Sequence, residues 1–445
     1  MTSVLERAAN TFRLARLSLG ETGVAYLPEE RLRERQSARF RALVRHAYEY
    51  VPYYREWLRA AGAEPGDLRT VADLRRLPLV DKLDLALHPE RFASSAYASR
   101  DGLTLLSSGT SGRLRSFRHD TQALFESFAA GRRQRLVLRQ FIGKETAYRE
   151  AVFKRQGSAG DQIRHFWENR MWNPRSLDLT RRLFSPAQAY PDLLAAVNEF
   201  RPQVYRGIGS HLGAFLRWVC ETERHFERPK VVTYGADAMT ANDRRLIEAD
   251  LGIPVVSTYQ AVEALRIGFQ CEVRKGFHIS IDKVDVRVVD PSGVDVAPGE
   301  RGQLILTNLI NRATVVMNYR LGDLVTQSTG QCACGRTLPL IADIDGRLDD
   351  LIDRPGGTRL HALTILPRLQ AIAGLTQVQV VQNALDEFAL KVVWASGATP
   401  MPADLRTQMA AVLGDQIRVS VEAVDRLPQE PSGKVKSVIS DWKGR

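Results

Sequence analysis

The chain has 445 residues, of which 44% are hydrophobic and 25% are charged, and its formal net charge at pH 7 is +11. This length is enough for a large core and two or more domains, and the composition is typical of a globular protein. A membrane helix needs about 20 consecutive apolar residues, and the sequence contains no such run. Charged residues near the N-terminus, such as Glu6 and Arg7, argue against a signal peptide. We therefore expect a cytoplasmic protein with no membrane partner.

The cysteine count indicates the cellular compartment, and the distribution of charge indicates the kind of ligand. Four cysteines are too few for a disulfide framework in a chain of this length, which favours a reducing compartment. The positive charge is scattered, without a block of lysine or arginine, so anionic small ligands explain it as well as nucleic acid does. We expect no nucleic-acid partner.

The first hundred residues are predicted to be mostly helical. A charged amphipathic helix over residues 31–50 ends before Pro52, because proline cannot continue a helix. A short apolar strand over residues 103–106 leads into a glycine-rich loop, and Asp120 can cap the helix that follows. The periodicity of residues 143–180, which are charged and aromatic, is unclear.

Helices and strands alternate between residues 190 and 265, which predicts parallel α/β layers. The expected helices cover residues 191–200, 211–222 and 241–251. The expected strands cover residues 204–207, 230–234 and 254–258. Short strands separated by turns follow and predict an antiparallel or barrel-like subdomain. They cover residues 277–281, 284–289, 302–307 and 315–319.

The pattern after residue 348 predicts a small α+β unit. Its strands cover residues 378–381, 388–393 and 417–423, with a helix around residues 405–413. The expected fold class is therefore α/β, with two domains. A large N-terminal domain over residues 1–348 holds layered α/β subdomains and a β-barrel-like subdomain, and a small, mobile α+β C-terminal domain covers residues 349–445.

A loop rich in glycine and hydroxyl groups follows the first predicted strand. Gly109 and Gly112 let backbone N–H groups point at one anion. Hydroxyl donors surround them, at Ser107, Ser108, Thr110 and Ser111. The loop lacks the Gly-Lys-Ser/Thr ending of a Walker A motif. By itself the loop is explained equally well as a phosphate site or as a polar surface loop.

Other positions suit the remaining parts of a nucleotide. Tyr259 can stack on a purine, and Glu263 can hold Mg²⁺ beside phosphates. Asp323 can accept hydrogen bonds from two ribose hydroxyls, and Lys434 follows a flexible Ser-Gly pair from which an ammonium can reach a polyanion. Gly235-Ala236 forms a strand-end turn, where open α/β sheets bind ligands. Taken alone, these residues are explained as core or turn residues.

In this order along the chain, the motifs resemble those of the adenylate-forming superfamily, which includes acyl-CoA synthetases, nonribosomal adenylation domains and luciferases. Within it the chain is most similar to the phenylacetate–CoA ligase family. The matching segments run from about residue 40 to the C-terminus: Val51–Arg55, Leu77–Lys82, Ser107–Gly112, Gly235-Ala236, Tyr259–Glu263, Tyr319–Asp323, Cys332–Thr337, Gly346–Asp350 and Ser432–Lys434. Each motif is weak alone, but the ordered combination is specific.

The resemblance implies which residues bind ATP. The loop Ser107–Gly112 would hold the pyrophosphate part of ATP. Gly235, Ala236 and Tyr259 would frame the adenine.

The resemblance also implies roles in catalysis and in domain movement. Asp323 and Arg347 would bind the ribose, and Glu263 would bind Mg²⁺. Asp349 would be the hinge about which the small domain swings. Lys434 would contact the α-phosphate and the acyl oxygens during adenylation. Glu263 and Lys434 are thus the expected catalytic residues, and coenzyme A is the expected second substrate.

Cysteine and histidine residues suggest a separate metal site. Cys271 and His278 bracket a turn, and Cys332 and Cys334 lie in the loop after Asp323. Three thiolates and one imidazole make a full tetrahedral set for a structural Zn²⁺. The alternative is a group of cytosolic thiols without a metal.

The sequence departs from the family pattern near the expected acyl pocket. Gln260 stands where the family usually has Gly, and Val262 stands where it has Ser or Thr. Ala264–Ile267 replaces a Gly-Pro-containing run, and residues 143–180 are unusually basic. We therefore expect a polar aromatic or amino-aryl acid as substrate rather than phenylacetate, and reduced or redirected activity stays open.

Three hypotheses of function follow. The first is an enzyme that activates a small carboxylic acid with ATP as an acyl-adenylate, releases pyrophosphate and transfers the acyl group to coenzyme A. The second keeps adenylation but uses an amine, a carrier protein or nitrite as acceptor in a specialised biosynthetic pathway. The third is a non-catalytic nucleotide- or nucleic-acid-binding protein. The sequence leaves the oligomeric state open, including a homodimer.

Overall fold

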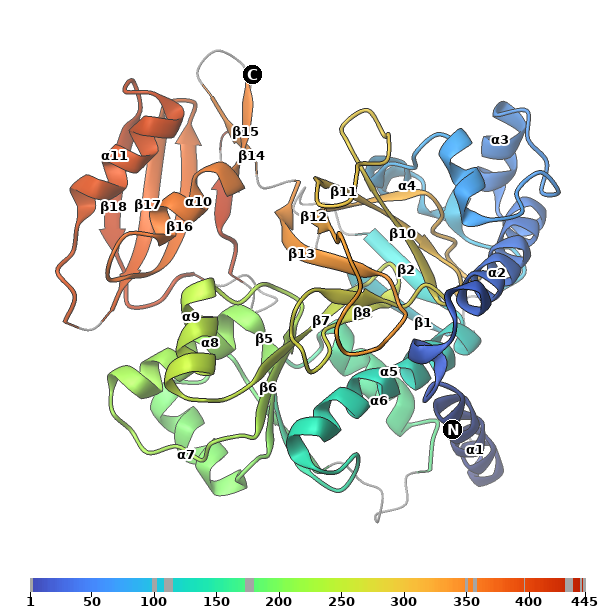
Figure 1. The fold of residues 1–445 in the computed structure, drawn as a ribbon, viewed down its shortest axis with the longest axis horizontal. Helices are drawn as coiled ribbons and strands as arrows, with labels where there is room; N and C mark the ends of the chain where they lie inside the picture. Colours follow the sequence, from blue (N-terminus) through green and yellow to red (C-terminus); the bar gives the residue numbers. More distant parts are fainter. Residues whose placement is uncertain are drawn as a thin grey trace.

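The computed structural model shows a large body of mixed α/β structure and a smaller C-terminal unit (Figure 1). It describes residues 3–97, 102–107, 115–172, 180–348, 351–354, 358–395, 397–428, 435–440 and 442.

Helices make up the N-terminal region, as predicted. Their bounds are α1 Val4–Gly20, α2 Glu29–Tyr50, α3 Pro52–Ala60 and α4 Lys82–Leu87. Val51 ends α2 and Pro52 opens α3, where its missing N–H removes no helical hydrogen bond. Leu32, Phe40 and Leu43 form the buried face of α2 and join the main core.

In the described part of the chain, eleven strands form one sheet in the order β10-β11-β12-β13-β9-β8-β7-β6-β5-β3-β4. Neighbouring strands from β4 to β7 pair in parallel, whereas those from β7 to β10 pair antiparallel. The bounds are β3 Arg149–Phe153, β4 Thr180–Phe184, β5 Val204–Ile208, β6 Val231–Gly235, β7 Val255–Ala261, β8 Leu265–Phe269, β9 Phe277–Ile279, β10 Val284–Val289, β11 Arg301–Asn308, β12 Tyr319–Gln327 and β13 Leu340–Arg347.

The antiparallel part of the sheet curls like a barrel. Strands β7 and β12 are four strand positions apart, which is about 19 Å in a flat sheet with a strand spacing of about 4.8 Å. Nevertheless Tyr259 on β7 makes a hydrogen bond to Asp323 on β12. The sheet must therefore curve enough to bring these strands together.

Helices cover both faces of the parallel strands, whose side chains alternate between the faces. Tyr205 and Val232 pack in a core cluster with residues of α7 and α8. The next residues, Arg206 and Thr233, face α5, where both make hydrogen bonds to Gln134. The bounds are α5 Thr121–Ile142, α6 Ala159–Glu168, α7 Tyr190–Phe200, α8 Gly209–Glu221, α9 Ala241–Arg245 and a π-helical segment Leu246–Asp250.

A short hairpin lies beside the main sheet and flanks the glycine-rich loop. Its strands are β1 Leu103–Ser107 and β2 Arg115–His119. The predicted cap of the next helix is present, since the Asp120 side chain accepts a hydrogen bond from the backbone N–H of Ala123 over 2.8 Å.

The predicted strand over residues 315–319 is wrong, because β12 begins only at Tyr319. The residues before it are irregular, and the backbone N–H of Met317 donates to the hydroxyl of Tyr54 over 2.8 Å instead of joining a strand ladder. Asp323 therefore lies in the middle of β12.

The C-terminal unit has a core of its own. Its main sheet has the order β18-β17-β16-β19, and its helices pack against that sheet. The bounds are β14 Leu351–Asp353, β15 Arg359–His361, α10 Leu366–Gln370, β16 Leu375–Ala384, β17 Glu387–Trp394, α11 Pro402–Leu413, β18 Arg418–Ala423 and β19 Val438–Ser440. The predicted α/β fold class with a small α+β unit is confirmed. The predicted boundary stays a prediction, and Asp349 lies outside the described residues.

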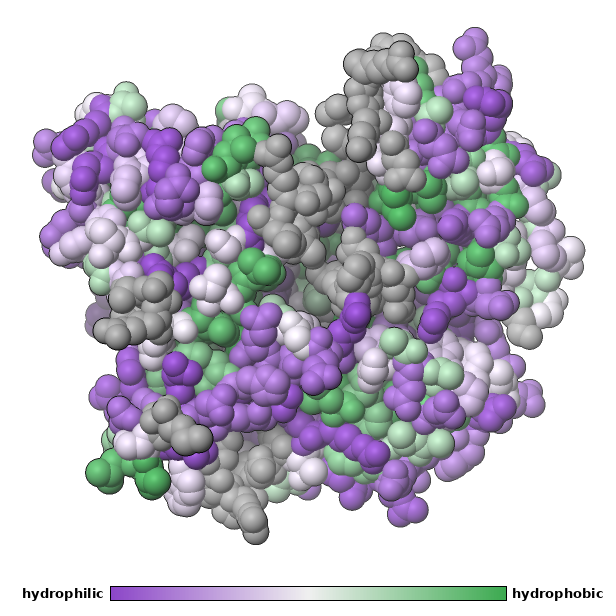
Figure 2. All heavy atoms as spheres, turned by 180° about the vertical axis from the view of Figure 1, so that it is seen from behind, coloured by the Kyte–Doolittle hydropathy of each residue, from purple (hydrophilic) through white to green (hydrophobic). Residues whose placement is uncertain are grey.

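No described helix combines the length and apolarity needed to span a bilayer. Seen from behind, the molecule shows apolar side chains in small groups between larger hydrophilic areas (Figure 2).

Candidate active site

The end of β7 meets β12 and β13 through polar side chains. The Tyr259 hydroxyl donates to Asp323 Oδ2 over 2.6 Å. Arg347 is the cross-strand neighbour of Asp323, with its Nε 3.8 Å from Asp323 Oδ1. Burial, then the Asp323 charge, raises the pKa of Tyr259 well above its usual value, so its hydroxyl remains a donor. Because a carboxylate has about four acceptor positions, Asp323 can still accept hydrogen bonds from ligand hydroxyls.

The carboxyl end of β6 approaches the end of β7 too closely for a side chain at Gly235. A Cβ there would lie 2.7 Å from Thr258 Oγ1. The next residue, Ala236, has φ +72, a conformation that costs energy for any residue with a Cβ. These parallel strands end at the same edge of the sheet, where open α/β sheets bind ligands.

Glu263 lies in the turn between β7 and β8 and is buried. Its Oε1 is 4.0 Å from Nη2 of the buried Arg115, whose Nε donates to Ser107 Oγ over 3.3 Å. Burial raises the pKa of Glu263, and the Arg115 charge offsets this only in part. A hard cation such as Mg²⁺ prefers carboxylate oxygen. A buried carboxylate that lacks full charge compensation therefore fits a magnesium ligand.

The four predicted zinc ligands lie close together, with Cys271 just after β8 and His278 on β9. Their ligand atoms all lie within 4.8 Å of one another. Cys271 Sγ is 3.6 Å from Cys332 Sγ, and Cys334 Sγ is 3.3 Å from His278 Nε2. A tetrahedral zinc with Zn–S bonds of about 2.3 Å separates its ligands by about 3.5–3.8 Å. His278 Nδ1 is 3.4 Å from the Leu338 carbonyl oxygen, which leaves Nε2 for a metal.

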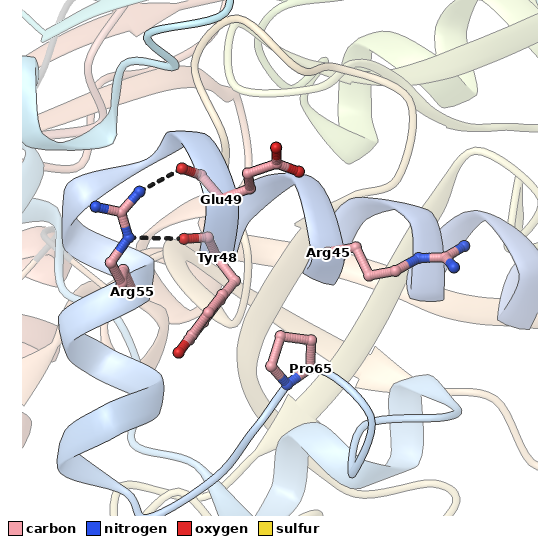
Figure 3. Close-up of a pocket in the computed structure, with 5 residues that line it drawn as sticks. All are labelled: Arg45, Tyr48, Glu49, Arg55 and Pro65. Carbon is pink, nitrogen blue, oxygen red and sulfur yellow. Dashed lines mark hydrogen bonds between the residues drawn. The ribbon is translucent and has the colours of Figure 1, made fainter.

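A surface hollow of about 450 Å³ lies elsewhere, at the corner between α2 and α3 (Figure 3). Arg55 donates hydrogen bonds there to the carbonyl oxygens of Tyr48 and Glu49. These bonds satisfy carbonyl groups at the end of α2. The polar side chain in the hollow therefore has a structural role as a helix cap. The hollow contains none of the predicted site residues.

Comparisons with known proteins bear on the family resemblance seen in the sequence. Residues 354–441 match the family model of the CapK C-terminal domain. The phenylacetate–coenzyme A ligase of Thermus thermophilus is 29% identical over 388 residues, which cover 82% of each chain. That of Escherichia coli K12 is 28% identical over 415 residues, 88% of this chain and 89% of the other.

These relatives confirm the predicted resemblance to the phenylacetate–CoA ligase family of the adenylate-forming superfamily. Solved structures show the same fold. A 2-hydroxyisobutyryl-CoA ligase in the postadenylation state with 2-HIB-AMP matches with a TM-score of 0.72 and 21% identity, covering 94% of this chain and 91% of the other. An anthranilate CoA ligase with anthranoyl-AMP matches with a TM-score of 0.52 and 14% identity, over 75% and 65% of the two chains. The predicted class of enzyme, an adenylate-forming ligase, is confirmed.

Several residues that the family resemblance singled out lie outside the described residues. They are Ser108, Gly109, Thr110, Ser111, Gly112, Asp349 and Lys434. The binding roles predicted for them, and those predicted for the described site residues, stay predictions. Among the described residues, the structure brings Tyr259, Asp323 and Arg347 into one group and Glu263 next to Ser107 through Arg115.

Two residues near this candidate site received no role from the sequence. The amine of Lys82 lies against Gly322, whose φ of +82 favours glycine. His361, from the C-terminal unit, has its Nε2 2.6 Å from the carbonyl oxygen of Arg347. Lys82 stood in a matching segment and could have been noticed, whereas the contact of His361 depends on the tertiary structure.

Proposed function

We propose that the protein activates a small carboxylic acid with ATP and transfers the acyl group to the thiol of coenzyme A. The observation that carries this proposal is the contact of Tyr259 with Asp323 beside Arg347. Three segments distant in sequence meet there, at the position where the family resemblance puts adenosine. The relatives named as phenylacetate–coenzyme A ligases support the same reaction.

In the first half-reaction, a carboxylate oxygen of the substrate attacks the α-phosphorus of ATP. The new P–O bond gives the acyl-adenylate, and pyrophosphate leaves with the electron pair of the broken bond. Asp323 would hold the ribose and Glu263 would hold Mg²⁺, which neutralises charge on the phosphates. The loop Ser107–Gly112 and Lys434 would add donors to the oxygens that gain charge.

In the second half-reaction, the thiolate of coenzyme A attacks the acyl carbonyl and AMP leaves. The nucleophile needs access to the carbonyl from the side that Lys434 would occupy during adenylation. A rotation of the C-terminal unit about Asp349 would withdraw that lysine and open this side. The same site could transfer the acyl group to an acceptor other than coenzyme A. The experiment below therefore compares several acceptors.

Pyrophosphate release in the presence of a panel of acids tests the proposal. The panel holds aryl, amino-aryl and short aliphatic acids, each assayed with coenzyme A, an amine or nitrite. We expect release that depends on the acid, and thioester formation with coenzyme A. Glu263→Gln should lower kcat/KM by about a hundredfold or more, whereas the exposed Glu221→Gln on α8 should not change it. The absence of acid-dependent release with every acid would contradict the proposal.

The cysteine and histidine cluster would hold a structural zinc ion beside this site. Four protein ligands would leave no open position for water or substrate, so the metal would stabilise the fold and take no part in the reaction.

A further inference from the structure

Four arginines gather between α5 and the sheet, next to the hairpin that carries Glu263. They are Arg135 on α5, Arg181 on β4, Arg206 on β5 and Arg266 on β8. Burial, then the charges of the other three arginines, lowers the pKa of Arg266 to about 9. The four guanidinium groups are therefore close enough to repel one another.

One carboxylate lies within this arginine group. Glu150 Oε2 accepts a hydrogen bond from Arg181 Nε over 2.5 Å, and its Oε1 accepts one from Arg206 Nε over 2.6 Å. Burial opposes the ionised form, but the charges of Arg206 and Arg181 prevail and lower the pKa of Glu150 to about 2. Glu150 thus supplies one negative charge to a group that has four positive charges.

Glu150 contacts Arg181 and Arg206, whereas Arg135 and Arg266 lie outside these contacts. Both are half-buried, and in the ranges that the structure describes neither makes a hydrogen bond or an ion pair. A charge withdrawn from water costs free energy unless it is paired. The two guanidinium groups therefore offer unused donors, each in a fork that matches a carboxylate or a phosphate.

The chain is shaped to accommodate Arg266. Its guanidinium lies against the buried Gly131 of α5, where a Cβ would be 3.0 Å from Nη2 and 3.1 Å from Cζ. A helix interior is an unfavourable place for glycine relative to alanine. The missing side chain leaves the space in which the guanidinium lies.

The arginine group is close to the proposed catalytic residues and open to solvent. Arg266 is the cross-strand neighbour of Gln260, and Glu263 lies in the turn that joins their strands. The Arg181 and Arg206 side chains retain 37% and 25% of their exposure. A small molecule bound at the end of β7 can thus present one end to Glu263 and the other to Arg266.

We propose that this arginine group binds a second anionic group of the acid substrate, at the end remote from the reacting carboxyl. The substrate class is then an acid with a further carboxylate, phosphate or sulfonate. This inference rests on the proposed function, because it uses the same acyl site. An uncharged acid of equal size would leave the guanidinium groups unpaired and would be a poorer substrate.

Matched acids test the inference by kinetics. An aryl dicarboxylic acid is compared with its half-amide, which has the same shape, and with sulfonate and phosphate analogues. We expect kcat/KM for pyrophosphate release to be at least about tenfold higher for the dicarboxylate than for the half-amide. Arg266→Gln should remove most of this ratio. Arg132 lies on α5, as Arg135 does, but is paired with Glu145, so Arg132→Gln should keep the ratio. Equal kcat/KM for the two acids in the wild type would overturn the inference.

Measuring ligand binding by the shift in Tm, without turnover, tests the inference independently of the kinetics. At fixed ionic strength, the dicarboxylate should raise the Tm of the wild type more than the half-amide does, and Arg266→Gln and Arg135→Gln should both lose that difference. These substitutions remove an uncompensated charge, so the variants are expected to fold. Equal shifts with the two compounds, or with chloride, would overturn the inference. If no acid supports pyrophosphate release, the proposed function fails, and the Tm comparison still decides whether the arginine group binds anions.

Discussion

At Asp323, one carboxylate connects parts of the chain that are far apart in sequence. It accepts a hydrogen bond from the Tyr259 hydroxyl and lies beside Arg347. These partners fix the orientation of the carboxylate before any ligand binds. A nucleotide ribose would then meet an oriented acceptor, which would lower the entropy cost of binding.

Replacement of Asp323 by Asn should weaken nucleotide use selectively. An amide keeps the size but loses the charge that strengthens hydrogen bonds to hydroxyls, so kcat/KM for ATP should fall by about 10–100-fold. Tyr259→Phe removes only the hydroxyl that orients the carboxylate and should cost less. Steady-state kinetics with varied ATP measures both. An Asp323→Asn enzyme with wild-type kcat/KM for ATP would rule out a ribose contact.

Asp285 predicts a measurable dependence of stability on pH. Burial raises its pKa from 3.8 to about 6, against the opposing charge of Arg287, and Gln36 Nε2 donates to its Oδ1 over 3.2 Å. A raised pKa means that its contribution to stability is complete below about pH 4 and is lost as pH rises through about 6. Asp285→Asn keeps a neutral side chain at every pH.

This variant should therefore match the wild type near pH 4 and exceed its free energy of unfolding by up to about 3 kcal/mol above pH 6. Urea unfolding of both proteins between about pH 4 and pH 8 measures the difference. A difference that does not vary with pH would show that Asp285 is ionised normally in the folded protein.

At the scale of elements, the β7–β8 hairpin joins the functional parts of the molecule. Its first strand carries Tyr259 and Gln260 near its end, its turn holds Glu263, and its second strand carries Arg266. Cys271 follows the same strand and meets the loop between β12 and β13 through Cys332. A zinc ion at that point would fix the hairpin against β12, where Asp323 lies.

The zinc hypothesis predicts about one zinc per chain by elemental analysis. Cys334→Ser removes one ligand and should lower both the zinc content and the Tm, because metal binding stabilises only the folded state. Cys220→Ser is the matched control, since this cysteine lies on α8, outside the cluster. Undamaged protein without bound metal, or a Cys334→Ser protein with full zinc content, would contradict the hypothesis.

The sequence predicted those elements whose periodicity is decided locally. The helix expected over residues 191–200 is α7, at Tyr190–Phe200, and the strand expected over 230–234 is β6, at Val231–Gly235. The apolar residues 315–319 have strand composition, but a hydrogen bond from Met317 to the distant Tyr54 decides their structure. No local pattern could show that contact.

Some residues of the candidate site were likewise predictable from the sequence, and others were not. The zinc ligands and the pair of Tyr259 and Asp323 were found in the sequence because each belongs to a motif of recognisable residue types. The arginine group was not found, because its members come from four elements and each looks like an ordinary surface charge. The fold brings Arg181 and Arg206 together at Glu150, which accepts a hydrogen bond from each.

At the scale of the whole molecule, the reaction depends on how the C-terminal unit meets the larger body. His361 of that unit already contacts the Arg347 carbonyl near the ribose position. Arg426 of the same unit lies over the ring of Tyr190 on α7, 5.8 Å from its centroid. These contacts stabilise one arrangement of the two units, and the proposed second half-reaction requires another.

Lys434 should therefore separate the two half-reactions. Lys434→Ala should slow acyl-adenylate formation by about a hundredfold or more, because it removes a cation from the oxygens that gain charge. Transfer from a supplied acyl-adenylate to coenzyme A should keep its rate. Lys443→Ala, which changes a lysine near the C-terminus that is expected to be solvated, should affect neither step. Equal slowing of both steps by Lys434→Ala would contradict a role confined to adenylation.

The most direct test of the central proposal is a crystal structure of the protein with AMP or a stable acyl-adenylate analogue. We predict density for the adenine beside Tyr259 and Gly235, with the ribose hydroxyls at Asp323 and the phosphate on the side of Glu263. A nucleotide bound at full occupancy away from these residues would contradict the proposed function.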